Sequence, residues 1–308
     1  MAGKHFFTSK HVWAAVIVIC VAACGAWWLN GSKAETSRRA AVSADGKLHA
    51  TVSSYIVYAL AREIGGEQVV LSMLVPPGTE PHHFEPTPGS IIAVDETGLF
   101  LYVSPQAEPW VPSILHGLGQ VRAVAIAPVE PEDDPHIWTT PYGALSMAQE
   151  ISRTFAKADP AHKKLYQARL KSFEREMQQL HEAFTQGLAN CQHRDVIHIG
   201  HLAFEPLAHT YNLNLSLLSG TASQGEHSVQ RLAQLVRQVR QKKATAIFSE
   251  EMLPPDLAAT VARETRVHIL PLYSIEEVSK QDFDRGVSYG EYMRRNLKNL
   301  QEGLQCQA

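Results

Sequence analysis

Three of the 15 histidines differ from the others in where they lie along the chain. His82 lies in VPPGTEPHHFEPTPGS and His136 lies in EDDPHIW, each directly after a proline that restricts the backbone. His201 comes one glycine after the apolar segment DVIHI. Imidazole is the commonest protein ligand for transition metals and also a general acid or base near neutral pH. Because 54 and 65 residues separate the three, only the fold could bring them into one site.

The elements that must position these histidines alternate between short apolar strands and helices. We expect helices at 54–66, near 109–118, at 228–241 and from Tyr289 to Leu304. The strands that we expect are 48–53, 68–75, 99–104, 121–127, 195–199, 213–218, 245–250 and 267–272. This alternation favours parallel sheets covered by helices on both faces. Open parallel sheets bind ligands beyond the carboxyl ends of their strands, which is where His82 and His201 fall.

The segment 160–188 separates the two groups of strands. After Pro160 it has no further proline, and its first glycine is Gly187. Apolar residues recur at steps of three or four, as on one face of a helix of about eight turns. We therefore expect an α/β fold of two lobes, each with a mainly parallel sheet flanked by helices, joined by one long rigid helix. The expected boundaries are 48–158 for the N-terminal lobe, 159–189 for the linking helix and 190–308 for the C-terminal lobe.

The first residues have the features of a targeting segment. Lys4 and Lys10 precede an uncharged apolar run at 12–31. VAAC resembles a lipobox that would make Cys24 a lipidated first residue, whereas SKA fits the cleavage site of a secreted chain. The run is also long enough to span a bilayer uncleaved. We expect residues 1–34 to be a signal peptide, lipoprotein signal or membrane anchor and 35–47 a polar tether. Each alternative places the rest of the chain outside the cytoplasm.

Cysteine content and charge agree with an exported body. Cys191 and Cys306 either form a disulfide or remain two free thiols. The net charge is −3, and the first 40 residues carry five Lys or Arg and one Glu, which leaves −7 on the rest. An acidic body disfavours nucleic acid as a partner and is compatible with cations.

Five motifs follow one another in a recognisable order. They are GTEPHHFEPTP, DPHIW, HLAFEPLAHTYNL, AIFSEEMLPPDLAATVARET and SYGEYMRRNLKNL. In this order they resemble segments of the periplasmic solute-binding proteins that serve zinc and manganese ABC transporters. The resemblance extends from about residue 47 to the C-terminus. It implies two α/β lobes joined by a rigid helix with a metal ion bound between them, the same division that the sequence pattern predicts.

The resemblance makes His82, His136 and His201 metal ligands. It leaves His83 in a variable position after the first ligand, and we expect His198 to point away from the site. Neutral imidazole suits divalent transition metals, and three imidazoles with one further donor make a tetrahedral site.

The fourth ligand is where this chain departs from the family. The family's usual aspartate has no direct counterpart, because simple register puts Tyr273 at its place in LPLYSIEEVSKQDFDRG. Glu276 is the preferred candidate because it lies close to the end of a predicted strand. The alternatives are Tyr273 itself, Glu277, Asp282, Asp284 or a water molecule.

Three imidazoles favour Zn²⁺ over Mn²⁺ or Fe²⁺, which suit oxygen-rich ligand sets. The resemblance thus implies a monomer that captures zinc between its lobes and delivers it to an ABC permease and its ATPase. One alternative is a manganese- or iron-binding member of the same family. Another is a surface-anchored zinc hydrolase with a three-histidine site, in which Glu250 or Glu251 would be the base, or an adhesin with a structural metal. The sequence has no HExxH, GxSxG or phosphate-binding loop, so we expect no enzyme.

Overall fold

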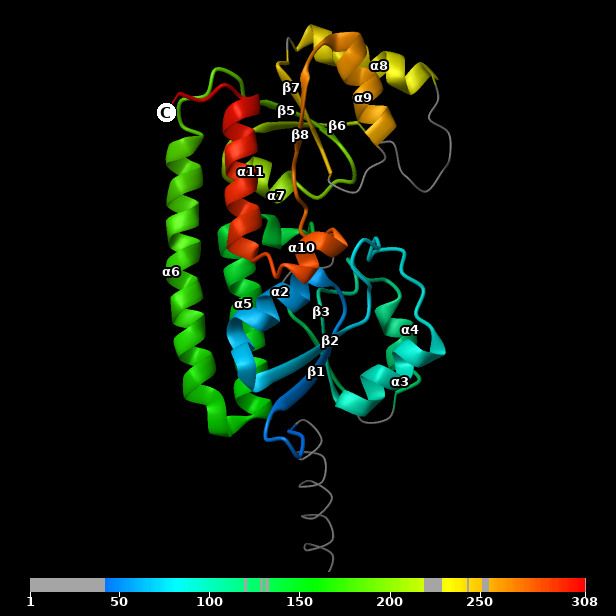
Figure 1. Cartoon of the computed structure of the whole chain (residues 1–308), viewed down its shortest axis with the longest axis vertical. Helices are drawn as coiled ribbons and strands as arrows, with labels where there is room; N and C mark the ends of the chain where they lie inside the picture. Colours follow the sequence, from blue (N-terminus) through cyan, green and yellow to red (C-terminus); the bar gives the residue numbers. More distant parts are fainter. Residues whose placement is uncertain are drawn as a thin grey trace, which may run out of the picture.

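The structure is a computed structural model that describes residues 42–118, 121–127, 130, 133–218, 229–242, 244–250 and 255–307. Two lobes lie one above the other, with long helices along one side of both (Figure 1). The predicted targeting segment and Cys24 lie outside the described residues. Among the described residues, no helix is long and apolar enough to cross a membrane.

Each lobe contains one four-stranded parallel sheet, which confirms the predicted fold class. The first sheet has the order β2-β1-β3-β4 and the second the order β6-β5-β7-β8. The strands of the first sheet are β1 (Leu48–Val52), β2 (Val69–Met73), β3 (Leu99–Tyr102) and β4 (Arg122–Ala125). Those of the second are β5 (Asp195–Ile199), β6 (Asn214–Leu218), β7 (Ala246–Ser249) and β8 (His268–Pro271).

Helices cover both faces of the sheets, as the apolar strands require. One continuous core joins the two lobes and includes the inner faces of α2, α5, α6 and α11. A second core on the other face of the first sheet packs β3 against α3 and α4. The bounds are α2 (Tyr55–Gly65), α3 (Pro88–Thr97), α4 (Val111–Leu115), α5 (Pro141–Ala158), α6 (Lys163–Gly187), α7 (Glu205–Thr210), α8 (Val229–Gln241), α9 (Pro255–Thr265), α10 (Lys280–Asp284) and α11 (Tyr289–Gly303).

Helix α3 begins inside the segment that the sequence predicts to be an irregular loop. Pro88 is the first residue of the helix, where a proline loses no helical hydrogen bond. Thr87 caps the helix by accepting a hydrogen bond from the backbone N–H of Ser90. The stiff loop around His82 is therefore shorter than predicted and is bounded by β2 and α3.

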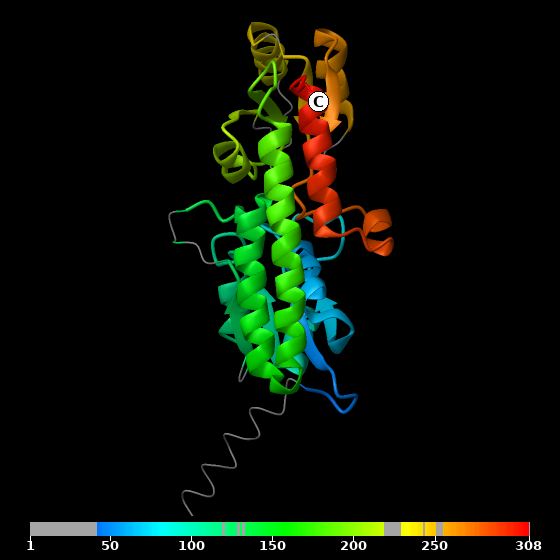
Figure 2. The ribbon, with the colours of Figure 1, turned by 90° about the vertical axis from the view of Figure 1, so that its left-hand side faces the viewer.

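The long linking helix is present as α6, preceded by a 3-10 turn, η3 (Pro160–His162). Its apolar face is buried against α5 and α11, and α6 runs past both lobes, with α5 beside its N-terminal half and α11 beside its C-terminal half (Figure 2). The turn between α5 and α6 is closed by the buried carboxylate of Asp159, which accepts hydrogen bonds from Tyr166 Oη and His162 Nδ1, both at 2.7 Å. Helix α6 is thus the predicted linking helix, and together with α5 and α11 it forms a three-helix layer.

The chain after β8 crosses back onto the N-terminal lobe. Tyr55 Oη on α2 donates to the carbonyl of Val287 at 2.7 Å, and Arg62 donates to the carbonyls of Gly286 and Val287. Phe283 on α10 packs against the Tyr58 ring at 5.4 Å. The segment between β8 and α11 therefore contacts both lobes and fixes them relative to each other.

The structure joins Cys191 and Cys306 in a disulfide. Cys191 lies just after α6, and Cys306 lies just after α11, so the bond links the ends of two helices of the layer. The backbones on either side also pair, because the N–H of His193 donates to the carbonyl of Leu304.

We expect the double variant Cys191→Ser with Cys306→Ser to lower the free energy of unfolding by about 2–5 kcal/mol, because the cross-link restricts the unfolded chain. Urea unfolding of the variant and of the oxidised wild type measures the difference. Reduced wild type serves as the control and should match the double variant. Identical urea midpoints for oxidised wild type and variant would contradict this expectation.

Candidate metal centre

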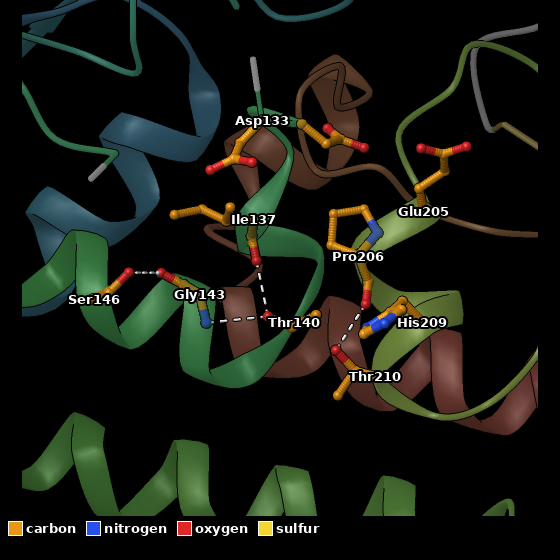
Figure 3. A pocket seen from close by; sticks show the side chains of 10 residues that line it. Asp133, Ile137, Thr140, Gly143, Ser146, Glu205, Pro206, His209 and Thr210 are labelled. Atoms are coloured by element: carbon orange, nitrogen blue, oxygen red, sulfur yellow. Dashed lines mark hydrogen bonds between the residues drawn. The ribbon is translucent and has the colours of Figure 1, made fainter. Parts of the chain in front are cut away.

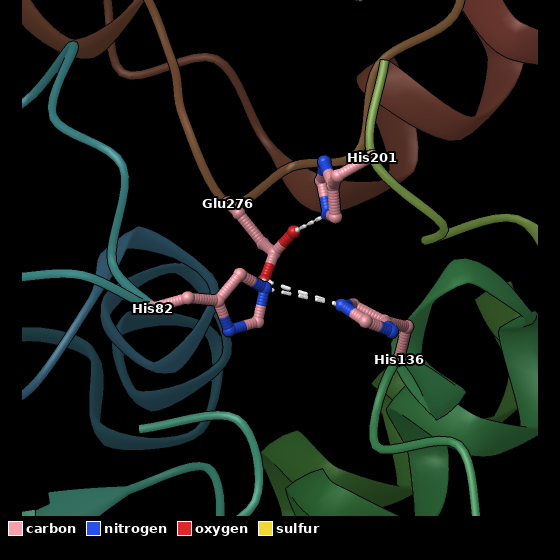
Figure 4. Close-up of side chains that lie close together, drawn as sticks. All are labelled: His82, His136, His201 and Glu276. Carbon is pink, nitrogen blue, oxygen red and sulfur yellow. Dashed lines mark hydrogen bonds and ion pairs between the residues drawn. The ribbon is translucent and has the colours of Figure 1, made fainter. Parts of the chain in front are cut away.

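The side chains of His82, His136, His201 and Glu276 converge at the junction of the two lobes (Figure 4). Each offers one ligand atom, and these atoms lie within 4.8 Å of one another. His82 Nε2 is 3.2 Å from His136 Nε2 and 3.2 Å from Glu276 Oε1. His201 Nε2 is 2.7 Å from Glu276 Oε2. The cluster lies where the carboxyl ends of the two sheets meet, because its members follow β2, β4, β5 and β8.

The outer nitrogen of each imidazole contacts an oxygen that can only accept a hydrogen bond. His82 Nδ1 lies 2.5 Å from the carbonyl oxygen of Ala107. His136 Nδ1 lies 2.6 Å from Asp134 Oδ1, and His201 Nδ1 lies 2.5 Å from Glu250 Oε1. Each Nδ1 must therefore carry the proton, so each neutral ring presents the lone pair of Nε2 to the centre. Three nitrogen lone pairs and a carboxylate consequently face one another, and only a cation can satisfy them all.

Two of these inward atoms, His201 Nε2 and Glu276 Oε2, are fully shielded from solvent and form an ion pair at 2.7 Å, with no further hydrogen-bond partner among the described residues. Buried charged groups are costly unless further partners, such as an ion or a water molecule, satisfy them. Three imidazole nitrogens and one carboxylate oxygen are a donor set that fits tetrahedral Zn²⁺.

In the metal-free cluster, protons on the imidazole rings balance the negative charge of the buried Glu276 carboxylate. Burial lowers the pKa of His82, but the hydrogen bond and the charge of Glu276 outweigh this effect and raise it to about 9. Burial likewise lowers the pKa of His201, yet the Glu250 and Glu276 carboxylates raise it to about 11. Burial disfavours the charged form of Glu276, but hydrogen bonds from His201 and His82 hold its pKa well below the usual range. The centre therefore attracts positive charge strongly.

Carboxylates around the cluster add to this potential. Burial, followed by the neighbouring carboxylates of Glu250, Glu80 and Glu276, raises the pKa of Glu277 to about 7. Beside Asp134 there is also an open pocket of about 720 Å³ between α5 and α7 (Figure 3). Its lining residues are Asp133, Asp134, Ile137, Thr140, Gly143, Ser146, Glu205, Pro206, His209 and Thr210. Acidic side chains of both lobes thus line the surface next to the cluster, which favours the approach of cations.

The loop of each histidine is held by local contacts. Glu80 accepts hydrogen bonds from the backbone N–H groups of His82 and His83, and Trp110 Nε1 donates to the carbonyl of Pro81 at 2.8 Å. His201 follows Gly200, at which a Cβ would lie 2.5 Å from the Glu250 carboxyl carbon.

His136 is fixed by contacts to the residues on both sides of it. Its backbone N–H donates to Asp134 at 2.8 Å, and it is followed by a 3-10 turn, η2 (Ile137–Thr139). Thr140 then caps α5 by accepting from the N–H of Gly143 at 3.0 Å. A Cβ at Gly143 would lie 1.8 Å from the Ile137 carbonyl oxygen, so the turn and the helix approach each other at a distance that only glycine allows.

Most of the chain matches a known family. The model of the zinc-uptake complex component A, periplasmic (ZnuA), matches residues 51–303. The chain belongs to this family. The match confirms the resemblance seen in the motifs, and the family's description agrees with the extracytoplasmic location predicted from the N-terminal segment.

Individual members of the ZnuA family support this assignment along most of the chain. The high-affinity zinc uptake system protein ZnuA of Bacillus subtilis is 28% identical over 95% of this chain and 98% of its own length. The zinc-binding lipoprotein AdcA of Streptococcus pneumoniae is 27% identical over 84% of this chain, which spans 56% of that relative. The chain therefore corresponds to little more than half of AdcA.

Solved structures of the ZnuA family share the fold. The Zn(II)-bound ZnuA-like domain of S. pneumoniae AdcA superimposes with a TM-score of 0.76 at 28% identity, covering 84% of this chain and 99% of that domain. The laminin-binding protein Lmb of Streptococcus agalactiae, described as a bifunctional protein with adhesin and metal-transporting activity, gives a TM-score of 0.75 at 28% identity. That match covers 83% of this chain and 99% of Lmb.

The structure brings together the three predicted histidines and, of the five candidates for the fourth position, Glu276. Asp282 instead forms ion pairs with Arg285 and Arg295, and Asp284 pairs with Lys280. Tyr273 packs its ring against Tyr292 and Arg295.

The two other histidines of these segments lie apart from the cluster. His83 is 79% exposed and contacts Glu80, whereas His198 is fully buried against the Phe204 ring. Sequence reasoning missed the three acceptors at the outer nitrogens. The motif DPH contained a signal for Asp134, since a residue two positions before a histidine can reach its ring, whereas no sequence signal indicates the Ala107 carbonyl.

We expect Gly143→Ala to lower the free energy of unfolding by about 1–3 kcal/mol and to weaken zinc binding, because the new Cβ displaces the turn that carries His136. Thermal unfolding and zinc titration calorimetry measure the two effects. Gly89→Ala is the matched control, since a Cβ there meets its nearest neighbour at 3.6 Å in the first turn of α3. Equal zinc affinities for Gly143→Ala and wild type would show that this contact does not position the ligand.

Proposed function

We propose that this protein binds one Zn²⁺ ion between its lobes and delivers it to an ABC permease powered by an ATPase. The observation that carries the proposal is the convergence of four lone-pair donors, with all three imidazoles oriented by acceptors at their outer nitrogens. In this proposal residues 48–158 and 190–308 form the two lobes, and 159–189 link them. His82, His136, His201 and Glu276 are the metal ligands.

Zinc is favoured over manganese and iron by the donor set. Nitrogen ligands dominate the cluster, whereas Mn²⁺ prefers carboxylate, carbonyl and water oxygens in higher coordination numbers. Four protein ligands also fill a tetrahedral sphere, which suits Zn²⁺. Several relatives and solved neighbours are named as zinc-binding proteins.

The chain is a binding protein and not an enzyme. A catalytic zinc site keeps one coordination position open for water or substrate, whereas in this proposal Glu276, which lies within 4.8 Å of the three histidines, takes the fourth position. Glu250, the predicted base of the hydrolase alternative, is instead hydrogen-bonded to the outer nitrogen of His201. Glu251, the other candidate base, lies outside the described residues.

The proposed partners follow from the family description as a component of a zinc-uptake complex. Zinc is the cargo, and the permease and its ATPase are the protein partners. A monomer without affinity for nucleic acid, held at the membrane by a lipid on Cys24 or by an uncleaved anchor, completes the proposal. The adhesin alternative is supported by the descriptions of laminin-binding neighbours such as Lmb.

We expect His82→Ala, His136→Ala and His201→Ala each to raise the Kd for zinc by more than about 100-fold. Each removes a ligand, which costs more than the roughly 10–100-fold that loss of an outer hydrogen-bond partner costs. Zinc titration calorimetry measures the change, with a competing chelator for the wild type. His83→Ala is the control, because its exposed ring contacts Glu80 outside the cluster. Equal losses at positions 82 and 83 would refute the ligand assignment.

We expect zinc affinity to rise with pH between about 6 and 8. The pKa values of about 9 for His82 and about 11 for His201 mean that the metal-free site holds protons at pH 7. Zinc must displace these protons, so affinity falls as pH falls, by roughly ten- to hundredfold per pH unit. Calorimetry in two buffers of different ionisation enthalpy counts the protons released on binding. Binding without proton release at pH 7 would contradict the electrostatics of the site.

A further inference from the structure

The residue directly before Glu276 has an unusual backbone conformation. Ile275 has φ = +66° and is 1% exposed. For a β-branched residue the left-handed region is a true outlier, because Cβ crowds the neighbouring carbonyl. Such conformations persist only where surrounding contacts impose them, and they cluster at ligand clamps and switches.

Two side chains hold this conformation by hydrogen bonds to the backbone of the two residues just before Ile275. The amide of Asn296, on α11, accepts from the N–H of Tyr273 at 2.8 Å and donates to its carbonyl at 2.9 Å. Trp138 Nε1 donates to the carbonyl of Ser274 at 2.9 Å. Trp138 and Asn296 are both completely or almost completely buried, so neither bond competes with solvent.

Trp138 also belongs to the turn that carries His136. The N–H of Thr139 donates to the carbonyl of His136, and the rings of His136 and Trp138 lie 5.2 Å apart. Tyr289 Oη, at the start of α11, donates to the carbonyl of Trp138 at 2.7 Å. The bond from Trp138 to Ser274 therefore connects a metal ligand of the N-terminal lobe directly to the segment that carries Glu276.

We propose that Trp138 and Asn296 form a latch that holds Ile275 in its left-handed conformation and thereby aims the Glu276 carboxylate at the three imidazoles. When the bond between Trp138 and Ser274 opens, Ile275 returns to an extended conformation and the carboxylate withdraws. The latch thus sets how fast the site releases its ion. This inference rests on the proposed function, because it treats the cluster as a zinc site.

The principal test is Trp138→Phe, which keeps an aromatic ring in the core but removes the donor to Ser274. We expect the rate of zinc dissociation to rise about 10–100-fold, as on loss of other outer partners, while the association rate changes less than about threefold. Stopped-flow mixing of the zinc-loaded protein with an excess of a chelating dye measures dissociation. Asn296→Leu should change dissociation in the same direction.

Asn299→Ala is the matched control. Asn299 lies on the same helix as Asn296 and donates to the carbonyl of Pro271 at 2.8 Å, outside the clamped segment. The rate of zinc dissociation from the Asn299→Ala variant should equal that from the wild type. Urea unfolding of each metal-free variant establishes that it is folded before the kinetic measurement.

A spectroscopic readout separates positioning from a general loss of stability. The Co²⁺-loaded Trp138→Phe variant should show d–d absorption shifted from the wild-type spectrum toward that of Glu276→Gln, since both changes weaken the carboxylate bond. Unchanged dissociation and an unchanged Co²⁺ spectrum in Trp138→Phe would overturn the latch while leaving the proposed function intact. A wild type that fails to bind zinc would overturn the proposed function itself.

Discussion

Lone pairs that face one another at short distance repel, and a fold that brings them together must hold them against that repulsion. In this protein each imidazole donates its outer proton to a fixed oxygen, which leaves the inner nitrogen as an acceptor. The Glu276 carboxylate adds negative charge at the same point. The cluster is therefore stable only with positive charge inside it, either as protons on the rings or as a metal ion. When the cluster captures a divalent cation, the metal ion replaces the protons on the rings.

The framework that resists this repulsion is built from the ends of two parallel sheets and the helices beside them. Loops at the carboxyl ends of strands are not held by regular secondary structure, yet the side chains on them must be placed accurately. The structure achieves this with proline before His82 and His136, with carboxylates that accept from the backbone, and with the buried indoles of Trp110 and Trp138. Rigid loops reduce the entropy that is lost when an ion binds.

The sequence predicts the parts of this arrangement that depend on local chemistry. The three histidines, the alternation of strands and helices, and the long amphipathic helix all follow from residue types and spacing. Helix α3 was not predicted, because a proline that breaks a helix interior is favoured as the first residue of a helix.

The fourth position of the cluster shows what the sequence left open, because Glu276 was the preferred candidate among several alternatives. Simple register assumes a regular backbone after β8, whereas the left-handed conformation at Ile275 directs the next side chain elsewhere. That conformation depends on Trp138 and Asn296, which lie far from it in the sequence. The role of the Ala107 carbonyl could not be predicted either, because every residue has a carbonyl and only the tertiary structure places this one beside His82. Long-range contacts thus determine the positions of site residues that composition and spacing do not determine.

The three-helix layer restricts how such a site can open. Helix α6 runs along both lobes and shares a core with α5 beside the N-terminal lobe and α11 beside the C-terminal lobe, and the segment around α10 ties the C-terminal half to α2. A wide rotation of one lobe would break this core, whose apolar contacts are not easily replaced. The residues from 272 to 279 have no regular secondary structure and carry one ligand. Movement of this short segment would remove one of the four ligands while the three imidazoles stay in place. The fold therefore favours metal exchange through local displacement of the carboxylate over separation of the lobes.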